Sequence, residues 1–364
     1  MVSVKDFTDY GFDFASCRMI SNDDYETLKR NGCVPQIDDI LIGKDGARFF
    51  EDIIIYRQRE KPALLSSIAI LRCDKSKILP DFLYYVLRTP SFRQDVKDKY
   101  GSGSAIPRII LKDFKRMMVS YPSLEKQQAI ISVLTAIDSK IQANTEINDN
   151  LYAQAKAIFD NHFINIDAIP AGWRKGNLLD IANYLNGLAM QKFRPQGNEI
   201  GLPVLKIKEL RQGSCDDSSE LCSLRIKPEY IIHDGDVIFS WSGSLLVDIW
   251  CGGTCGLNQH LFKVTSDIYD KWFYYLWTAH HLARFIAIAA DKATTMGHIK
   301  REELAKAEVL IPCEEDYTSL TSIMQPIFEL IISNRIEARK LAALRDELLP
   351  KLMSGEIDVS AIQL

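Results

Sequence analysis

Apolar side chains in residues 123–163 recur at alternating steps of four and three, the spacing that forms the seam of a coiled coil. No Gly or Pro interrupts this stretch, so the pattern predicts one long helix. The same spacing returns 190 positions later in residues 314–353, and Asn144 of the first seam matches Asn334 of the second. The first seam contains Ile130, Leu134, Ile137, Ile141, Asn144, Asn148, Leu151, Ala155 and Ile158; the second contains Leu320, Met324, Ile327, Ile331, Asn334, Ala338, Leu341, Arg345 and Leu348.

The repeat continues outside the helices. DFLYYVL at 81–87 matches KWFYYLW at 271–277 with the same offset of 190, while DDILIGKDG at 38–46 parallels GDVIFSWSG at 235–243 with an offset of 197. A larger offset upstream indicates loop insertions in the second half. Each half is therefore predicted to be a globular unit followed by a long helix.

Each globular unit combines short β-branched runs with amphipathic segments, which predicts a mixed α/β architecture. The chain is expected to divide into a first globular unit at 1–122, a first helix at 123–167, a second globular unit at 168–312, and a second helix with a C-terminal tail at 313–364. Predicted strands are 53–56, 67–71, 236–239 and 260–264, and predicted helices are 81–88, 91–100 and 271–289.

Charge is distributed unevenly along these segments. The two globular units contain 36 basic and 33 acidic side chains, whereas the two helical segments contain 8 basic and 15 acidic ones. Any contact with DNA is therefore expected on the globular units. The chain has no apolar run of about 18 residues and no apolar core near its start, so a cytoplasmic protein without a membrane span is expected.

Motifs for catalysis are missing or weak. The only Gly-Lys pair, Gly43-Lys44, is followed by Asp45 and makes no phosphate-binding loop. None of the 13 Pro follows Asn or Asp, so the motif that holds a flipped adenine in amino-methyltransferases is missing. Asp81, Asp95 and Lys97 superficially resemble a metal-dependent nuclease motif, but they lie on amphipathic helical patterns, which favours a solvated helix face.

The eight cysteines do not form the dense, even framework of a disulfide-rich secreted protein. Cys251 and Cys255, with His260 nearby and Cys215 and Cys222 upstream, have ligand types that suit zinc. The first half has no Cys at the matching positions, and the C-x3-C spacing is loose. Reduced core or loop cysteines, with no bound metal, are favoured.

Polar loops that contain Gly occur once in each half, at 99–108 and 292–301, and suit contacts with phosphate. Asn and Gln can pair bidentately with adenine, so the triplet Asn258-Gln259-His260 beside a Ser/Trp turn predicts a base-reading surface. The candidate DNA contacts of the first half are Lys44, Arg48, Ser102, Ser104 and Arg108. Those of the second half are Trp241, Ser242, Ser244, Asn258, Gln259, His260, Thr295, His298, Lys300 and Arg301.

At these residues the chain resembles the specificity subunits of type I restriction-modification systems. FSWSGSLLVDIWCGG, LNQHLFKV and ATTMGHIKR are similar to that family's second target-recognition domain. GSGSAIPRIILKDFK and YPSLEKQQAI, with the helix that follows, resemble the end of a first domain and the first central conserved region. The resemblance covers almost the whole chain, including the order unit, helix, unit, helix.

The resemblance implies an α+β fold with two target-recognition domains, separated by two long antiparallel coiled-coil helices and related by a pseudo-twofold repeat. It implies a DNA-binding subunit without catalysis and without its own cofactor. Each domain would read one half of a split target in double-stranded DNA. Separate methylation subunits, two of them expected, and restriction subunits would use S-adenosylmethionine, Mg and ATP.

Two consequences concern the helices. A helix of about 40 residues spans about 60 Å, or 17 to 18 base pairs, so helix length is expected to set the unread gap in the target. Asn144 and Asn334 lie near the middle of their helices, so antiparallel packing would bring them opposite one another and fix the register.

One departure from the family and several alternatives remain. The second unit has 32 residues, 172–203, before the point that matches Met1, so either the start codon lies upstream or the chain is a shortened or recombined cassette. The alternative functions are a silent cassette, a stand-alone DNA-modifying enzyme or nuclease that uses Asp81, Asp95 and Lys97, and a coiled-coil scaffold without affinity for DNA.

Overall fold

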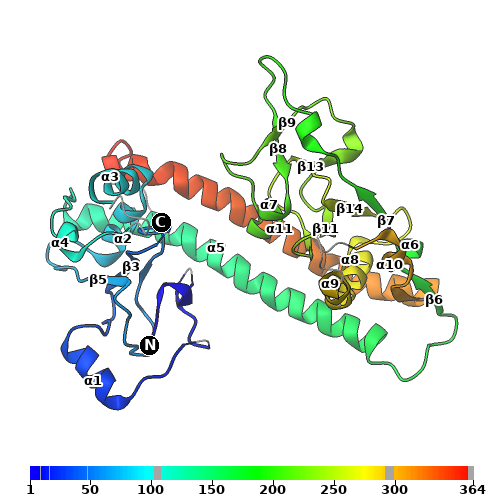
Figure 1. Ribbon diagram of the computed structural model, residues 1–364, viewed down its shortest axis with the longest axis horizontal. Coiled ribbons are helices and arrows are strands. Elements are labelled where there is room, and N and C mark those ends of the chain that lie inside the picture. Colours follow the sequence, from blue (N-terminus) through cyan, green and yellow to red (C-terminus); the bar gives the residue numbers. More distant parts are fainter. Residues whose placement is uncertain (9, 16, 47, 102–107, 292–298, 360–364) are drawn as a thin grey trace. The chain divides into compact units, whose positions relative to one another are not determined.

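The computed structural model describes residues 1–8, 10–15, 17–46, 48–101, 108–291 and 299–359. It divides into two compact units, Met1–Ser139 with Ala342–Leu364, and Lys140–Leu341. The predicted long helices are present as α5 (Leu124–Phe159), continued by a π-helical turn, and α11 (Glu314–Ser354) (Figure 1). Each long helix contributes one end to each unit, and the units are described separately.

Unit 1 is built on a three-stranded antiparallel sheet. Its central strand, β3 (Ile40–Gly43), pairs with β4 (Ile53–Ile55) on one side and β5 (Ile68–Leu71) on the other. All four residues of β3 are buried because apolar clusters cover both faces of the sheet. The other elements of unit 1 are β1 (Phe7–Thr8), β2 (Gly11–Phe12), α1 (Asn22–Arg30), α2 (Pro80–Arg88), α3 (Pro90–Tyr100) and α4 (Leu111–Phe114).

Helix α2 packs its apolar face against the long helices of unit 1. Phe82 and Tyr85 contribute to one buried cluster with residues of α5 and α11, among them Leu134 and Leu352. The Tyr85 hydroxyl donates to Asp138 at 2.6 Å, and Arg345 donates to the same carboxylate at 2.9 Å. Arg345 can therefore occupy a seam position because its charge is neutralised across the seam.

Unit 2 contains a larger set of strands. The main sheet has the order β12-β11-β14-β7 with antiparallel pairing throughout. A second sheet has the order β10-β13-β8-β9, and β15 pairs with β6. The strands are β6 (Arg174–Asn177), β7 (Asn183–Asn186), β8 (Leu202–Leu205), β9 (Leu221–Cys222), β10 (Ile231–Ile232), β11 (Val237–Ser240), β12 (Leu246–Ile249), β13 (Cys255–Leu257), β14 (Leu261–Thr265) and β15 (Glu308–Ile311).

Aromatic packing forms the core of unit 2. The helices are α6 (Leu178–Ile181), α7 (Ile207–Gln212), α8 (Lys271–His280), α9 (Leu282–Asp291) and α10 (Arg301–Ala305). Trp277 of α8 lies edge-on to Phe159 of α5 with ring centroids 5.0 Å apart, and Tyr275 packs against Phe328 of α11 at 5.6 Å. The prediction of one helix over 271–289 was wrong: α8 ends at His280, and buried His281 instead contacts the Glu308 carbonyl through Nε2 at 2.7 Å.

The predicted seams are confirmed. Every one of their 18 positions is buried or half-buried, and none is exposed. Asn144 of α5 donates to Glu337 of α11, whereas Asn148, one turn later, donates to the Ile331 carbonyl. The contacts advance along α5 as they retreat along α11, so the helices run antiparallel.

The two main sheets share one topology but differ at one edge. Strand β14 of unit 2 pairs with both β11 and β7, whereas the corresponding β5 pairs only with β3 among the described strands. Likewise β15 pairs with β6, while the matching residues 118–121 lie outside any described strand. Both extra strands of unit 2 come from the segment 172–203.

Candidate nucleic-acid interface

Two loops of unit 2 meet at one end of the strands of the main sheet. Residues 241–245 connect β11 to β12, and residues 258–260 lead into β14. Because Ser240 pairs with Leu261, the ends of β11 and β14 adjoin and bring the two loops together. The buried Ser240 hydroxyl donates to the carbonyls of Ser242 and Ser244, at 3.2 and 3.0 Å, and so holds the turn in shape.

Trp241 lies half-buried at the centre of this surface. Its ring is 6.1 Å from that of His260 and 5.7 Å from that of Phe262, centroid to centroid. The indole Nε1 donates to Asn186 Oδ1 at 2.9 Å. A hydrogen bond at one end and ring contacts along its face orient the indole, so Trp241 can present an apolar edge without large rearrangement.

Polar side chains form a short chain beside it. Ser242 Oγ lies 3.0 Å from His260 Nδ1, and Gln259 Nε2 lies 3.3 Å from His260 Nε2. If the Gln259 amide is the donor, His260 carries its proton on Nδ1 and donates it to Ser242. Ser242 is buried, whereas Gln259 and His260 are half-buried and Ser244 is exposed.

Asn258 has a different environment from its neighbours. It is 6% exposed, and its Oδ1 accepts from the backbone amide of His260 at 3.3 Å. Its backbone amide donates to Leu205, and its carbonyl accepts from Leu261. Gly187 approaches so closely that an added Cβ would lie 2.2 Å from the Asn258 carbonyl oxygen. Asn258 thus holds the loop, and Gln259 is the more accessible amide.

The basic residues of the second half lie next to the turn. The Ile299 amide donates to the Trp241 carbonyl at 2.9 Å, which fixes the start of α10 at this edge. Lys300 and Arg301 follow at once and are exposed, and Arg301 donates to the Tyr184 carbonyl at 3.2 Å. The predicted contacts Thr295 and His298 lie outside the described residues.

Unit 1 repeats this arrangement. The Ile109 amide donates to the Lys44 carbonyl at 2.9 Å, and these residues match Ile299 and Trp241 in the sequence repeat. Lys44 pairs with Asp45 at 3.3 Å, while exposed Arg48 pairs with Asp52 at 2.6 Å. The backbone of exposed Arg108 forms an isolated antiparallel β-bridge with the backbone of Asp45. Ser102 and Ser104 lie outside the described residues.

Comparison with known proteins identifies this architecture. The family model described as "Type I restriction modification DNA specificity domain" matches the chain twice, over residues 3–153 and 170–344. The chain belongs to this family. Its two matched segments correspond to the two halves of the internal repeat.

Similar proteins agree with the family. The chain is 28% identical to the specificity subunit of the type I restriction enzyme MjaIX of Methanocaldococcus jannaschii, covering 79% of the chain and 71% of that protein. It is 19% identical to the HindI specificity subunit of Haemophilus influenzae, covering 79% and 80%. The fold is similar to the crystal structure of the type I restriction-modification S subunit from M. genitalium, with a TM-score of 0.51, 15% identity, and coverage of 86% and 82%.

The residues of the nuclease alternative are engaged elsewhere in this specificity-domain protein. Asp81 pairs with Arg57 at 2.6 Å, Asp95 with Lys99 at 2.5 Å, and Lys97 with Glu51 at 2.9 Å. Each is part of a separate surface ion pair, so the three do not share a site. Among the described residues, no group of three or more His, Cys, Asp or Glu is placed to hold a metal, and no helix is long and apolar enough to cross a membrane.

Sequence reasoning missed Asn186 in the specificity-domain surface. This residue ends β7, lies 55 positions from Trp241 and orients its indole. It belongs to the segment that has no counterpart in unit 1, so comparison of the two halves gave no signal for it. Asn186 reaches this surface because β7 pairs with β14.

Proposed function

We propose that the chain is the DNA sequence-recognition subunit of a type I restriction-modification complex, with each globular unit reading one half of a bipartite target. The observation that carries the proposal is the double match to a DNA specificity domain, once over each half. The same backbone hydrogen bond occurs in both units, from the Ile109 amide to the Lys44 carbonyl and from the Ile299 amide to the Trp241 carbonyl. This recurrence supports two equivalent reading sites.

Base reading in the second unit is assigned to the accessible polar groups around Trp241. Gln259 can present an amide to an adenine edge, and Ser244 can donate to or accept from any base. Trp241 supplies apolar contact, and His260 is oriented by Ser242. Asn258 is assigned to holding the loop in shape rather than to reading a base, because its Oδ1 already accepts a hydrogen bond from the His260 amide.

Phosphate contact is assigned to the basic side chains at the rim. Lys300 and Arg301 in unit 2, and Arg48 and Arg108 in unit 1, are exposed next to the reading turns. Such contacts set position and affinity without distinguishing bases. Thr295, His298, Ser102 and Ser104 belong to the same loops and stay predicted contacts.

Catalysis is assigned to partner subunits. Methylation subunits would transfer the methyl group from S-adenosylmethionine, and restriction subunits would cleave with Mg and ATP, all in the cytoplasm. The acidic long helices offer a surface for such proteins rather than for DNA. Helices of 36 and 41 residues are about 54 and 62 Å long, which supports a spacer that sets the unread gap between half-sites.

The test is the pattern of DNA methylation. The chain is expressed with its methylation subunits in cells without other adenine methylation, and modified positions are mapped across the genome. The proposal expects one bipartite motif with an unread gap of fixed length. Exchanging residues 168–312 for the corresponding domain of another specificity subunit should change one half-site only. Methylation without the chain, or a continuous motif, would contradict the proposal.

A further inference from the structure

The hairpin β11–β12 connects the reading turn to helix α11. One end of the hairpin is the turn 241–245, which contains Trp241 and Ser244 of the proposed reading surface. The other end is formed by Asp234, just before β11, by Asp248 and Ile249 at the end of β12, and by Cys251 just after it. Two arginines of α11, Arg335 and Arg339, contact this second end.

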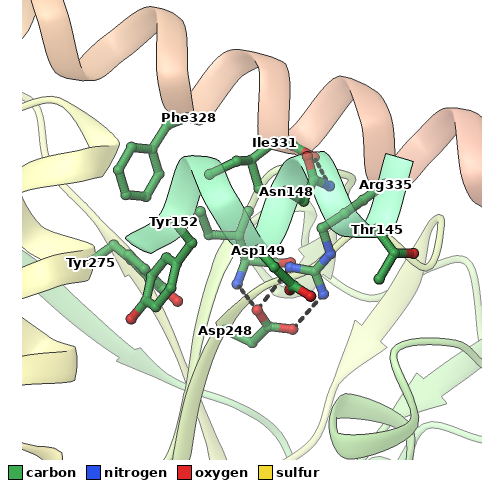
Figure 2. Close-up of a pocket in the computed structure, with 10 residues that line it drawn as sticks. Thr145, Asn148, Asp149, Tyr152, Asp248, Tyr275, Phe328, Ile331 and Arg335 are labelled. Atoms are coloured by element: carbon green, nitrogen blue, oxygen red, sulfur yellow. Dashed lines mark hydrogen bonds and ion pairs between the residues drawn. The ribbon is translucent and has the colours of Figure 1, made fainter. Parts of the chain in front are cut away.

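Arg335 binds the hairpin through three hydrogen bonds. Its two terminal nitrogens pair with the two oxygens of Asp248 at 2.8 and 2.7 Å, and Nη1 also donates to the Ile249 carbonyl at 2.8 Å. Figure 2 shows this pair beside a pocket of about 400 Å³. The two side chains are 31% and 24% exposed, so the planar, bidentate pair is largely shielded from water.

Arg339 repeats this contact one helical turn later. Its terminal nitrogens pair with both oxygens of Asp234 at 2.8 Å, and Nη1 donates to the Cys251 carbonyl at 2.6 Å. Asp234 also accepts from the Gly253 amide at 2.8 Å. Residues four apart lie on one face of a helix, so the two arginines form a single clamp on this end of the hairpin, at the end of β12 and at the segment that leads into β11.

The hairpin is rigid enough for the clamp at one end to fix the location of the reading turn at the other end. Every residue of β11 is fully buried, and β11 is bonded on both sides, to β12 and β14. Four residues span about 13 Å, so the clamp and the reading turn are separated by one short, stiff strand. A shift of the hairpin on α11 would displace the turn.

The clamp has no equivalent in the other half of the repeat. The residues 190 positions before Arg335 and Arg339 are Thr145 and Asp149, neither of which has a guanidinium. The asymmetry indicates a property specific to the second recognition domain.

We propose that Arg335 and Arg339 are positioning residues for DNA reading, which fix the reading turn of the second unit on α11 and so restrict the gap length that this unit accepts. The inference rests on the proposed function. A loosened clamp would let the turn engage its half-site at several positions along the DNA, so discrimination between gap lengths would fall while recognition of the half-site stayed.

The experiment uses the complex with its methylation subunits. Arg335→Lys, Arg339→Lys and the double variant keep the charge but lose the bidentate geometry. Methylation rates are measured on duplexes with the native gap and with one base pair more or less, and binding is measured on a duplex with the second half-site alone. Lys340→Ala is the control because Lys340 is an exposed neighbour on the same helix.

The double variant should methylate the native-gap duplex about tenfold more slowly, given how sharply rates depend on placement. The ratio of its methylation rates on native-gap and altered-gap duplexes should fall at least about tenfold, while its binding to the half-site duplex stays within about twofold of wild type. Lys340→Ala should change neither the ratio nor the binding. Asp234→Asn with Asp248→Asn should behave like the double variant. Circular dichroism melting and assembly with the methylation subunits check the fold.

Three results would overturn the inference: an unchanged gap preference, equal losses of gap preference and half-site binding, or lysine and asparagine variants that fail to assemble at all. The last would mean that the pairs hold the fold together rather than position the turn. A wild-type complex that shows no bipartite methylation would instead contradict the proposed function, so the two failures are distinguishable.

Discussion

The side-chain amide of Asn334 donates to Asn148 Oδ1 at 3.0 Å across the seam between α5 and α11. Asn148 in turn donates to the Ile331 carbonyl at 3.1 Å, and Asn144 donates to the Asn334 carbonyl at 3.4 Å and to Glu337 at 2.8 Å. The three asparagines form one connected ladder. Sliding one helix by a turn would separate these partners inside an apolar seam, so the ladder favours a single register.

Replacing Asn334 with Leu should destabilise unit 2. The substitution leaves the Oδ1 of half-buried Asn148 without its donor. An unsatisfied acceptor costs about 1–3 kcal/mol when it is fully buried, so a loss near the lower end of this range is expected. Urea unfolding should show this loss, whereas Asn150→Ala, at an exposed position of α5, should change stability by less than about 0.5 kcal/mol. Changing Asn144, Asn148 and Asn334 to Leu together should restore stability. A triple variant less stable than Asn334→Leu would contradict the ladder argument.

Gln259 is expected to read a base. Gln259→Ala removes an amide that can pair with an adenine edge, so it should relax specificity at one base pair of the second half-site by about 1–3 kcal/mol. Binding competition between duplexes substituted at each position measures the effect. The first half-site should be read as before, and a loss spread evenly over all positions would argue that Gln259 only shapes the loop.

Lys300 should behave as a phosphate contact. It is exposed at the start of α10 next to the reading turn. Lys300→Ala should weaken binding to every sequence alike and reduce the slope of log K against log salt by about 1. Lys192→Ala provides a comparison at another exposed lysine of unit 2. If Lys300→Ala altered sequence preference but not the salt slope, the assignment would be wrong.

Some of this organisation was predictable from the sequence and some was not. The long helices followed from regular apolar spacing, and the reading turns followed from comparison of the two halves. The clamp did not, because Arg339 and Asp234 are 105 positions apart, Arg335 and Asp248 are 87 apart, and the other half has no counterpart. Charged residues at half-buried positions look like solvated ones in a sequence, since only tertiary packing pairs them.

The unequal sheet edges predict unequal protection from hydrogen exchange. Alternate amides of β5 point away from β3, and no described strand pairs with them, whereas β14 is bonded on both sides. Residues 118–121 should likewise exchange faster than β15, which pairs with β6. Exchange followed by mass spectrometry compares the segments within one sample. Equal protection of β5 and β14 would show that the edge of β5 is covered in solution.

Acid should weaken the contact between Asp234 and Arg339. Partial burial, the largest single effect, raises the pKa of Asp234, but the hydrogen bonds from Arg339 and the Gly253 amide, together with nearby positive charge, lower the pKa below its ordinary value. A lowered folded-state pKa stabilises the protein above the unfolded-state value, and this contribution is lost as the pH falls through the folded-state pKa. Wild type should therefore lose more stability than Asp234→Asn between about pH 5 and pH 3. Urea midpoints across this range measure the difference, and parallel curves for the two proteins would exclude a stabilising charge at Asp234.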